Sequence, residues 1–355
     1  MNTTGLFTST PTNVAAWALK PKERPLTVSS APYLKPPKGH VVIKVYDVAV
    51  NPIDWILQDD DIFHAKYPTV FGSDAAGEIA EVADDVKDFQ IGTRVIAHCS
   101  RAKDVDLPSG ATGAFQKYVV VQASAVAELP YTIPSSTGVV LPLGISTASA
   151  GLYQKDFLNL PYPVSDGNPK SLGRTILIWG GSSSVGSCAI QLAVASGVEV
   201  VTTCSERNFD YVEELGAAAA FDYRKKDVED EVVKWLDGKT VVGAYHAVGE
   251  GGAQAAARIV DRAKGKAIVV TVRGVPEEGV PGSVRMKAVG AGAIFENDVG
   301  PTIWRDFLPK ALKNGTIVPK PGPKIVGENL RSVQLGLDTQ KKGVSAEKVV
   351  VSYIN

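Results

Sequence analysis

The chain has 355 residues, which at about 150 residues per domain indicates about two domains. Hydrophobic residues make up 45% and charged residues 21%, a globular composition that excludes disorder, collagen and coiled coil as descriptions of the whole chain. Lys and Arg total 37 against 38 Asp and Glu, and no basic stripe is present, which argues against nucleic-acid binding.

Three features of the chain bear on its compartment. Cys99, Cys188 and Cys204 are odd in number and widely spaced, so they predict no disulfide framework. The segment 1–25 lacks the apolar core of a signal peptide, and no run of 18 apolar residues exists to span a membrane. We therefore expect a cytoplasmic protein with reduced thiols and no membrane contact.

The first third of the chain predicts short strands separated by Gly and Pro turns. The longest is a β-branched run from His40 to Val50, which Asn51-Pro52 stops. Further strands are expected at 77–82, 92–97, 115–121 and 125–129. Short strands at this spacing indicate a compact β-barrel-like unit.

The middle of the chain alternates between strands and helices. The apolar run Thr175–Trp179 is typical of a strand buried on both faces. Further strands are expected at 198–203, 219–222, 241–248 and 266–272, with helices ending near 196 and spanning 208–216, 227–236 and 253–262. In the second of these helices Asn208 is the expected N-cap. This alternation predicts βαβ units and a doubly wound parallel sheet.

The tail changes pattern again. A helix is expected at 304–313, three prolines interrupt the segment after it, and a last strand is expected at 348–353. We predict a β-rich unit formed by residues 1–131 and completed by 301–355, around an inserted α/β domain of residues 132–300.

A glycine-rich loop between a predicted strand and helix is the strongest local motif, Gly180-Gly-Ser-Ser-Ser-Val-Gly186. Gly181 and Gly186 match the first and third glycines of the dinucleotide fingerprint, whereas Ser183 replaces the second. Such a loop places backbone N–H groups around a pyrophosphate. It lacks the Gly-Lys-Ser/Thr of a Walker A loop and the G-x-S-x-G of a hydrolase, which disfavours both classes.

The end of the second predicted strand indicates which dinucleotide is used. NAD sites usually carry an acidic residue there, but this chain has Thr203 and Cys204, followed by Ser205-Glu-Arg207. A hydroxyl and a guanidinium suit the 2′-phosphate of NADP(H). Glu206 is acidic and could instead bond the ribose hydroxyls of NAD(H), so NAD(H) is the alternative cofactor.

Five blocks in order resemble the medium-chain dehydrogenase/reductase superfamily over nearly the whole chain. They are Val50-Asn-Pro-Ile-Asp-Trp55, Pro68-Thr-Val-Phe-Gly-Ser-Asp-Ala-Ala-Gly77, Gly92-Thr-Arg-Val95, Gly144-Ile-Ser-Thr-Ala148 and Ser345-Ala-Glu-Lys-Val-Val350. The likeness is greatest to the zinc-free quinone oxidoreductase and enoyl reductase branch, including fungal trans-acting enoyl reductases of polyketide pathways. It implies a GroES-like β-barrel domain with an inserted Rossmann domain, and a nicotinamide cofactor in the cleft between them.

The metal-binding positions of the zinc-dependent relatives are altered here. Those enzymes carry a Cys near the position of Asn51 and a Gly-His-Glu near Gly72, where this chain has Gly72-Ser73-Asp74. Only Cys99 lies where their four-cysteine lobe is expected. Since zinc needs three or four close ligands, we expect no metal site.

The resemblance also implies catalytic residues. Asn51 and Asp54 are expected at the base of the cleft, and Tyr67 lies in a loop where several enoyl reductases carry a proton-donating Tyr. Tyr67 packing against the barrel is the alternative. Ile56 stands where some fungal relatives carry Lys, and His64 and His246 are further candidate acids.

The candidate cofactor residues come from several segments. The resemblance assigns the pyrophosphate to the loop and the adenosine phosphate to the end of the second strand. Thr271 is placed by its position at the carboxyl end of a strand. Phe295 lies in an expected strand, 291–295. That strand is expected either to line the nicotinamide pocket or to pair between two subunits, and the alternative for Phe295 is packing in the core. The full set is Thr147, Gly181, Ser182, Ser183, Ser184, Val185, Gly186, Ser205, Arg207, Asn208, Tyr223, Thr271, Phe295 and Ser345.

These features predict an NADPH-dependent, zinc-independent reductase of enones, quinones or enoyl thioesters, as a monomer or homodimer. The expected acceptor is a small molecule (an enone, a quinone or an acyl thioester) or a polyketide bound to a carrier protein. One alternative is an NADPH-binding protein with a structural or stress role and little turnover. An aldehyde or alcohol oxidoreductase is the third reading.

Overall fold

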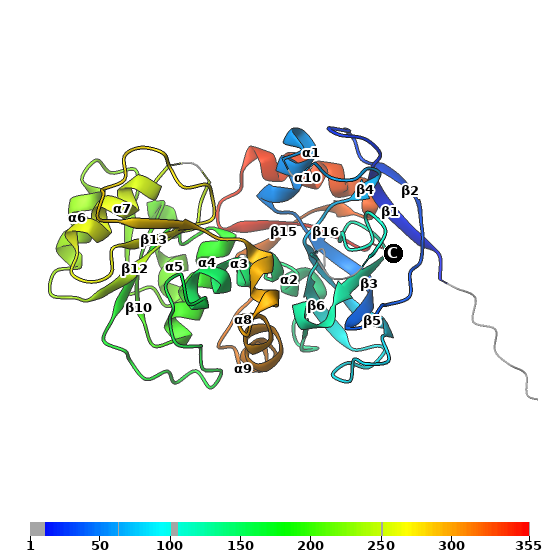
Figure 1. Cartoon of the computed structure of the whole chain (residues 1–355), viewed down its shortest axis with the longest axis horizontal. Coiled ribbons are helices and arrows are strands. Elements are labelled where there is room, and N and C mark those ends of the chain that lie inside the picture. The colour runs from blue at the N-terminus through cyan, green and yellow to red at the C-terminus, as the bar shows by residue number, and fades with distance from the viewer. Residues whose placement is uncertain (1–10, 63, 101–105, 250, 355) are drawn as a thin grey trace, which may run out of the picture.

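The computed structural model describes residues 11–62, 64–100, 106–249 and 251–354. Two units lie side by side, one built on a parallel sheet and the other on mainly antiparallel strands (Figure 1). None of the helices in the described part of the chain is long and apolar enough to cross a membrane.

The parallel unit is the predicted doubly wound sheet. Its six strands lie in the order β11 (Ala219–Asp222), β10 (Glu199–Cys204), β9 (Thr175–Trp179), β12 (Val241–His246), β13 (Ile268–Thr271) and β14 (Arg285–Ala288). Every neighbouring pair is parallel. The connecting helices are α4 (Ser184–Ala195), α5 (Phe209–Glu214), α6 (Val228–Trp235) and α7 (Ala253–Arg262). Because the order reverses between β9 and β12, the carboxyl ends of these strands form a ligand-binding edge.

The antiparallel unit contains strands from both ends of the chain. One sheet has β15 (Gly322–Glu328), β16 (Glu347–Ser352), β3 (His40–Ala49), β5 (Asp74–Val82), β6 (Arg94–His98) and β8 (Val126–Glu128), with β7 (Tyr118–Gln122) also paired to β3. The second has β2 (Thr27–Ala31), β1 (Asn13–Ala18) and β4 (Thr69–Val70). Val350 of β16 pairs with Ala49 of β3, so blue and red elements share one side of Figure 1. This arrangement confirms the GroES-like and Rossmann fold class, whereas boundaries at residues 131 and 301 stay a prediction.

Short helices flank the antiparallel unit and join it to the parallel one. They are α1 (Pro52–Asp60), α2 (Ser135–Gly138), α8 (Val299–Pro301), the π-helix η4 (Thr302–Phe307), α9 (Leu308–Asn314) and α10 (Val333–Lys342). Helix α1 starts at Pro52, three residues after β3 ends at Ala49, because Pro is well accommodated in the first turn of a helix.

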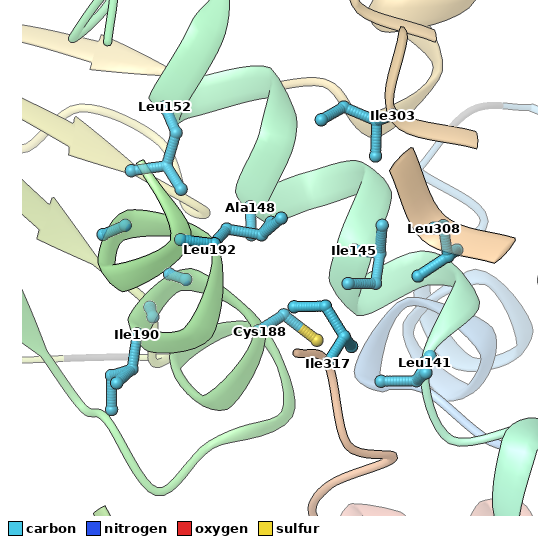
Figure 2. Close-up of a cluster of buried hydrophobic side chains, with 14 of the residues drawn as sticks. Leu141, Ile145, Ala148, Leu152, Cys188, Ile190, Leu192, Ile303, Leu308 and Ile317 are labelled. Carbon is cyan, nitrogen blue, oxygen red and sulfur yellow. The ribbon is translucent and has the colours of Figure 1, made fainter. Parts of the chain in front are cut away.

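Helix α3 (Pro142–Tyr153) joins the two units through a shared core. In Figure 2 its Ile145 and Leu152 lie among side chains of α4, such as Cys188, and of the tail, such as Ile303. A Cβ on Gly144 would lie 3.0 Å from the Cys188 sulfur, so the glycine lets α3 and α4 approach closely. The position of the barrel relative to the phosphate loop is therefore set by packed side chains.

The expected strand at 291–295 is wrong. Residues Ala291–Glu296 form a 3₁₀ helix, and β14 supplies the sixth strand of the parallel sheet. The segment contains two Ala and one Gly before Ile294, which gives it little of the β-branched content that strands favour. The turn is held by Asn297, whose side-chain amide donates to the Ala293 carbonyl at 2.9 Å.

Candidate active site

The glycine-rich loop joins β9 to the N-terminus of α4. Ser183 is the helix N-cap: its hydroxyl accepts from the Gly186 N–H at 3.0 Å and donates to the Ala247 carbonyl at 2.8 Å. A Cβ on Gly186 would lie 2.2 Å from the Gly180 carbonyl oxygen, so only glycine fits there. Ser183, which replaces the second fingerprint glycine, therefore has a structural use as a cap that ties the loop to the end of β12.

This loop fits a pyrophosphate. The first-turn N–H groups of a helix have no intrahelical acceptor, and the 12-residue α4 adds the positive end of its dipole. Ser182, Ser184 and Val185 lie in or beside that turn, which agrees with their assignment to the pyrophosphate. The assignment itself stays a prediction.

Asn208 brings three predicted cofactor residues together. Its side-chain amide donates to the hydroxyl of Ser182 at 3.3 Å and to that of Ser345 at 3.1 Å. Asn208 occupies the expected N-cap position of α5, but its side chain makes no capping hydrogen bond there. Its amide is used instead to join the phosphate loop, the end of β10 and the C-terminal segment.

Two arginines near the end of β10 differ in their partners. Arg224 is paired with Asp222, with 2.5 Å between Nη2 and Oδ2, and its hydrogen bonds lower the pKa of that carboxyl to about 2. Arg207 is exposed and pairs with no acidic side chain among the described residues. Ser205 precedes it, and Tyr223 is 47% exposed. The guanidinium open to a phosphate is therefore that of Arg207.

Two of the other candidate cofactor residues use their hydroxyls inside the protein. Thr147 donates to the Leu143 carbonyl at 2.6 Å within α3. Thr271 lies 3.0 Å from Nδ1 of His246, whose Nε2 lies 2.7 Å from the Gly251 carbonyl. Since a carbonyl only accepts, Nε2 carries a proton and His246 ties the loops after β12 and β13 together. Burial lowers the pKa of His246, which favours the neutral ring.

A buried charged network lies where the barrel meets the phosphate loop. Lys348 of β16 donates to Asn51 Oδ1 at 2.5 Å and to Ser184 Oγ at 3.4 Å, and lies 3.0 Å from Asp74 Oδ2. Asn51 donates from Nδ2 to the same Asp74 oxygen at 2.7 Å, and the other Asp74 oxygen accepts from the Leu143 N–H at 2.6 Å. Lys348, Asn51 and Asp74 are each at most 3% exposed. Sequence reasoning missed Lys348, although a lysine inside the apolar strand Glu347–Ser352 was a usable signal.

Asp54 belongs to the same region but has a different environment. Its Oδ2 accepts from the Asn51 N–H at 2.8 Å in a capping box, while its Oδ1 is buried without a partner among the described residues. Burial raises the pKa of Asp54 to about 7. Asp54 is therefore largely protonated in mildly acidic solution.

Tyr67 lies apart from that network. Its hydroxyl donates to Asp61 Oδ1 at 2.8 Å, and its ring packs against the barrel core. Burial, together with the Asp61 carboxylate, raises the pKa of Tyr67 to about 12. The structure thus brings Asn51 and Asp54 together and gives the Tyr67 hydroxyl another partner.

The donor set around Asn51 suits hydrogen bonding better than metal binding. Asn51, Ser73 and Asp74 supply an amide, a hydroxyl and one carboxylate that is already paired with Lys348. The described residues contain no group of three or more His, Cys, Asp or Glu that could hold a metal ion.

Two family models match the chain. The alcohol dehydrogenase GroES-like domain matches residues 37–131, and the zinc-binding dehydrogenase model matches residues 184–306. The first range covers most of the antiparallel unit, and the second begins at Ser184 inside the phosphate loop and covers the strands of the parallel sheet that follow it.

Curated relatives match over nearly the full length. Dehydrogenase pigH of Monascus ruber is 41% identical over 370 residues, covering 96% of this chain and 100% of the relative. Trans-enoyl reductase himH of Aspergillus japonicus is 43% identical over 344 residues, covering 96% and 97%. A solved alcohol dehydrogenase superfamily protein from Novosphingobium aromaticivorans has a TM-score of 0.78 at 22% identity, covering 96% and 99%. That structural likeness bears on the fold alone.

Proposed function

Because the chain belongs to the medium-chain dehydrogenase/reductase superfamily, in its zinc-free enoyl reductase and quinone oxidoreductase branch, we propose that it reduces carbonyl-conjugated double bonds with NADPH. That the chain is an oxidoreductase of this family follows from the relatives themselves. The cofactor and the acceptor are the proposal. The observation that supports it most is a phosphate loop beside a buried polar network with no set of zinc ligands among the described residues.

NADPH is favoured by the charge at the end of β10. The second-strand position that carries an acidic residue in NAD sites holds Thr203 and Cys204, both buried. Arg207 follows on the exposed side with no acidic partner among the described residues. An unpaired guanidinium beside the Ser205 hydroxyl suits the 2′-phosphate.

A bound NADPH would supply the hydride, so the protein's work is to bind, orient and stabilise charge. The α4 N-terminus and Ser182 would hold the pyrophosphate, and Asn208 fixes Ser182 against the C-terminal segment. Lys348 adds a positive charge beside Ser184, held there by Asp74. The buried network therefore couples the barrel to the cofactor-binding loop.

The names of the relatives support one class of acceptor. Because himH carries the name trans-enoyl reductase and is 43% identical over 96% of this chain, we propose an enoyl thioester, free or carrier-bound, ahead of a quinone. A double bond conjugated to a carbonyl accepts hydride at its β-carbon, and the charge that develops on the oxygen needs a hydrogen-bond donor.

The test is turnover of the purified protein with NADPH against enoyl thioesters, enones, quinones and aldehydes. We expect cofactor oxidation with the enoyl thioester and a product in which the carbon–carbon double bond has gained two hydrogens. Cofactor binding without oxidation by any acceptor would refute the proposal and favour the nucleotide-binding role with little turnover. Aldehyde reduction that requires stoichiometric zinc would favour the alcohol dehydrogenase reading instead.

A further inference from the structure

His98 is a buried histidine at the junction of the two units. It ends strand β6, is 3% exposed, and pairs in register with Asp74 of β5. Side chains of directly opposed residues in an antiparallel pair lie on the same face of the sheet. The imidazole therefore lies on the face where Asp74 meets Lys348 and the first turn of α3.

The ring is held in one orientation by side chains of two other elements. Ser146 of α3 lies 3.0 Å from His98 Nδ1, and the same hydroxyl accepts from Trp304 Nε1 at 3.0 Å. The Phe295 ring packs against the imidazole with 5.5 Å between centroids and against the Trp304 ring at 6.3 Å. Each of these contacts fixes the direction in which Nε2 points.

These hydrogen bonds also determine which nitrogen carries the proton. The Trp304 indole N–H can only donate, so the Ser146 oxygen is its acceptor. The hydroxyl proton of Ser146 has no other described acceptor than His98 Nδ1. Burial lowers the pKa of His98 to about 4, so at neutral pH the ring is neutral and its proton is on Nε2.

The Nε2–H group has no partner of its own. No residue in the described ranges accepts a hydrogen bond from it, and Nε2 is not one of the fully buried polar atoms that lack a partner in those ranges, so solvent or a ligand can reach it. An oriented, neutral donor beside the network that reaches the phosphate loop can hydrogen-bond a carbonyl oxygen of a ligand bound there.

We propose that His98 Nε2–H donates a hydrogen bond to the carbonyl oxygen of the bound acceptor, which makes His98 a catalytic residue; this rests on the proposed function. As hydride from NADPH adds to the β-carbon, the electron pair of the double bond moves toward the carbonyl and negative charge develops on its oxygen. A proton from water then adds to the α-carbon, giving the saturated carbonyl compound, NADP⁺ and hydroxide. His98 keeps its proton throughout, and Ser146 and Trp304 are positioning residues.

The experiment compares His98→Phe with His98→Gln and with His40→Phe. Phe keeps the ring and removes the donor, whereas the Gln amide restores an N–H near the position of Nε2. His40 is an equally buried histidine, 3% exposed, at the opposite end of β3 from the junction. Melting temperatures establish that all three variants fold.

We expect His98→Phe to lower kcat/KM for an enoyl thioester by about 100-fold, the loss typical of one oxyanion donor, with KM for NADPH unchanged. His98→Gln should recover much of that loss, and His40→Phe should match the wild type. Because a neutral donor does not titrate in this range, the loss should be the same from about pH 6 to 9. A loss confined to one side of that range, or an equal loss in His40→Phe, would overturn the role of His98.

A measurement without turnover gives an independent readout. para-Dimethylaminocinnamaldehyde absorbs at longer wavelength when its carbonyl accepts a hydrogen bond, and NADP⁺ cannot reduce it. We expect the red shift in the NADP⁺ complexes of wild type and His40→Phe, and its loss in His98→Phe. A shift that persists in His98→Phe, or that is absent from the wild type, refutes the hydrogen bond. Wild-type protein without turnover on any acceptor refutes the proposed function instead.

Discussion

Replacing Lys348 by Met should destabilise the protein strongly. The ammonium lies 3.0 Å from Asp74 Oδ2 and bonds Asn51, and the Asp74 side chain is 0% exposed. Met preserves the stem and removes the charge, so the carboxylate is left buried without its cation. Breaking a buried ion pair on one side typically costs about 3–5 kcal/mol. We expect a loss of that size in the free energy of unfolding, measured by urea denaturation at neutral pH.

The double variant Lys348→Met/Asp74→Asn tests the reasoning. Asn is neutral and can still accept from the Leu143 N–H, so most of the loss should be recovered, with a coupling of about 2 kcal/mol or more between the two substitutions. Lys348 also reaches Ser184 at the phosphate loop, so we expect weaker NADPH binding in both variants. A single variant that loses less than about 1 kcal/mol, or a double variant no more stable than the single one, would refute the ion-pair account.

Three further predictions concern single side chains. Arg207→Gln should raise KM for NADPH by about 10- to 100-fold and leave KM for NADH nearly unchanged, because it removes a charged partner of the 2′-phosphate; equal effects on both cofactors would contradict the assignment. Asp54 has a pKa of about 7 when folded and an ordinary one when unfolded, so it favours folding below about pH 4 and progressively loses that contribution as the pH rises through 7. Asp54→Asn should therefore gain stability relative to wild type between pH 5 and 8, by as much as about 4 kcal/mol, and a constant difference in urea titrations across that range would refute the shift. Ser183→Ala removes the cap on Gly186 and should lower the free energy of unfolding by about 1 kcal/mol while weakening NADPH binding, whereas an unchanged dissociation constant in fluorescence titration would place the cofactor elsewhere.

The parallel sheet was predictable because its signals are local. Strand β9 is apolar throughout and buried on both faces, and the glycine loop after it has few backbone alternatives. The helices α4 to α7 follow from periodicity within each segment. These elements are specified by consecutive residues, so a reading along the chain finds them to within a few positions.

Elements that depend on distant partners were missed or misassigned. Strand β15 contains Gly322 and Pro323 and has the pattern of a loop, yet it pairs with β16 along the sheet edge, where Pro is tolerated. Strand β14 is a four-residue edge strand whose register is set by β13. The segment 291–295 was expected to be a strand, but it lies in a 3₁₀ helix whose side chains complete a core shared by both units.

The candidate site shows the same division between local and distant determinants. The phosphate loop is contiguous and was identified from its glycines, whereas the groups around it come from the N-cap of α1 and from β5, β6, α3 and β16. Lys348 meets Asn51 across 297 residues of chain, and Trp304 meets Ser146 across 158. No spacing rule connects such pairs; what joins them is α3, whose first turn binds Asp74 and whose next turn presents Ser146 to His98. Since one helix carries both contacts and packs directly on α4, a change that shifts α3 should disturb the barrel network and the phosphate loop together.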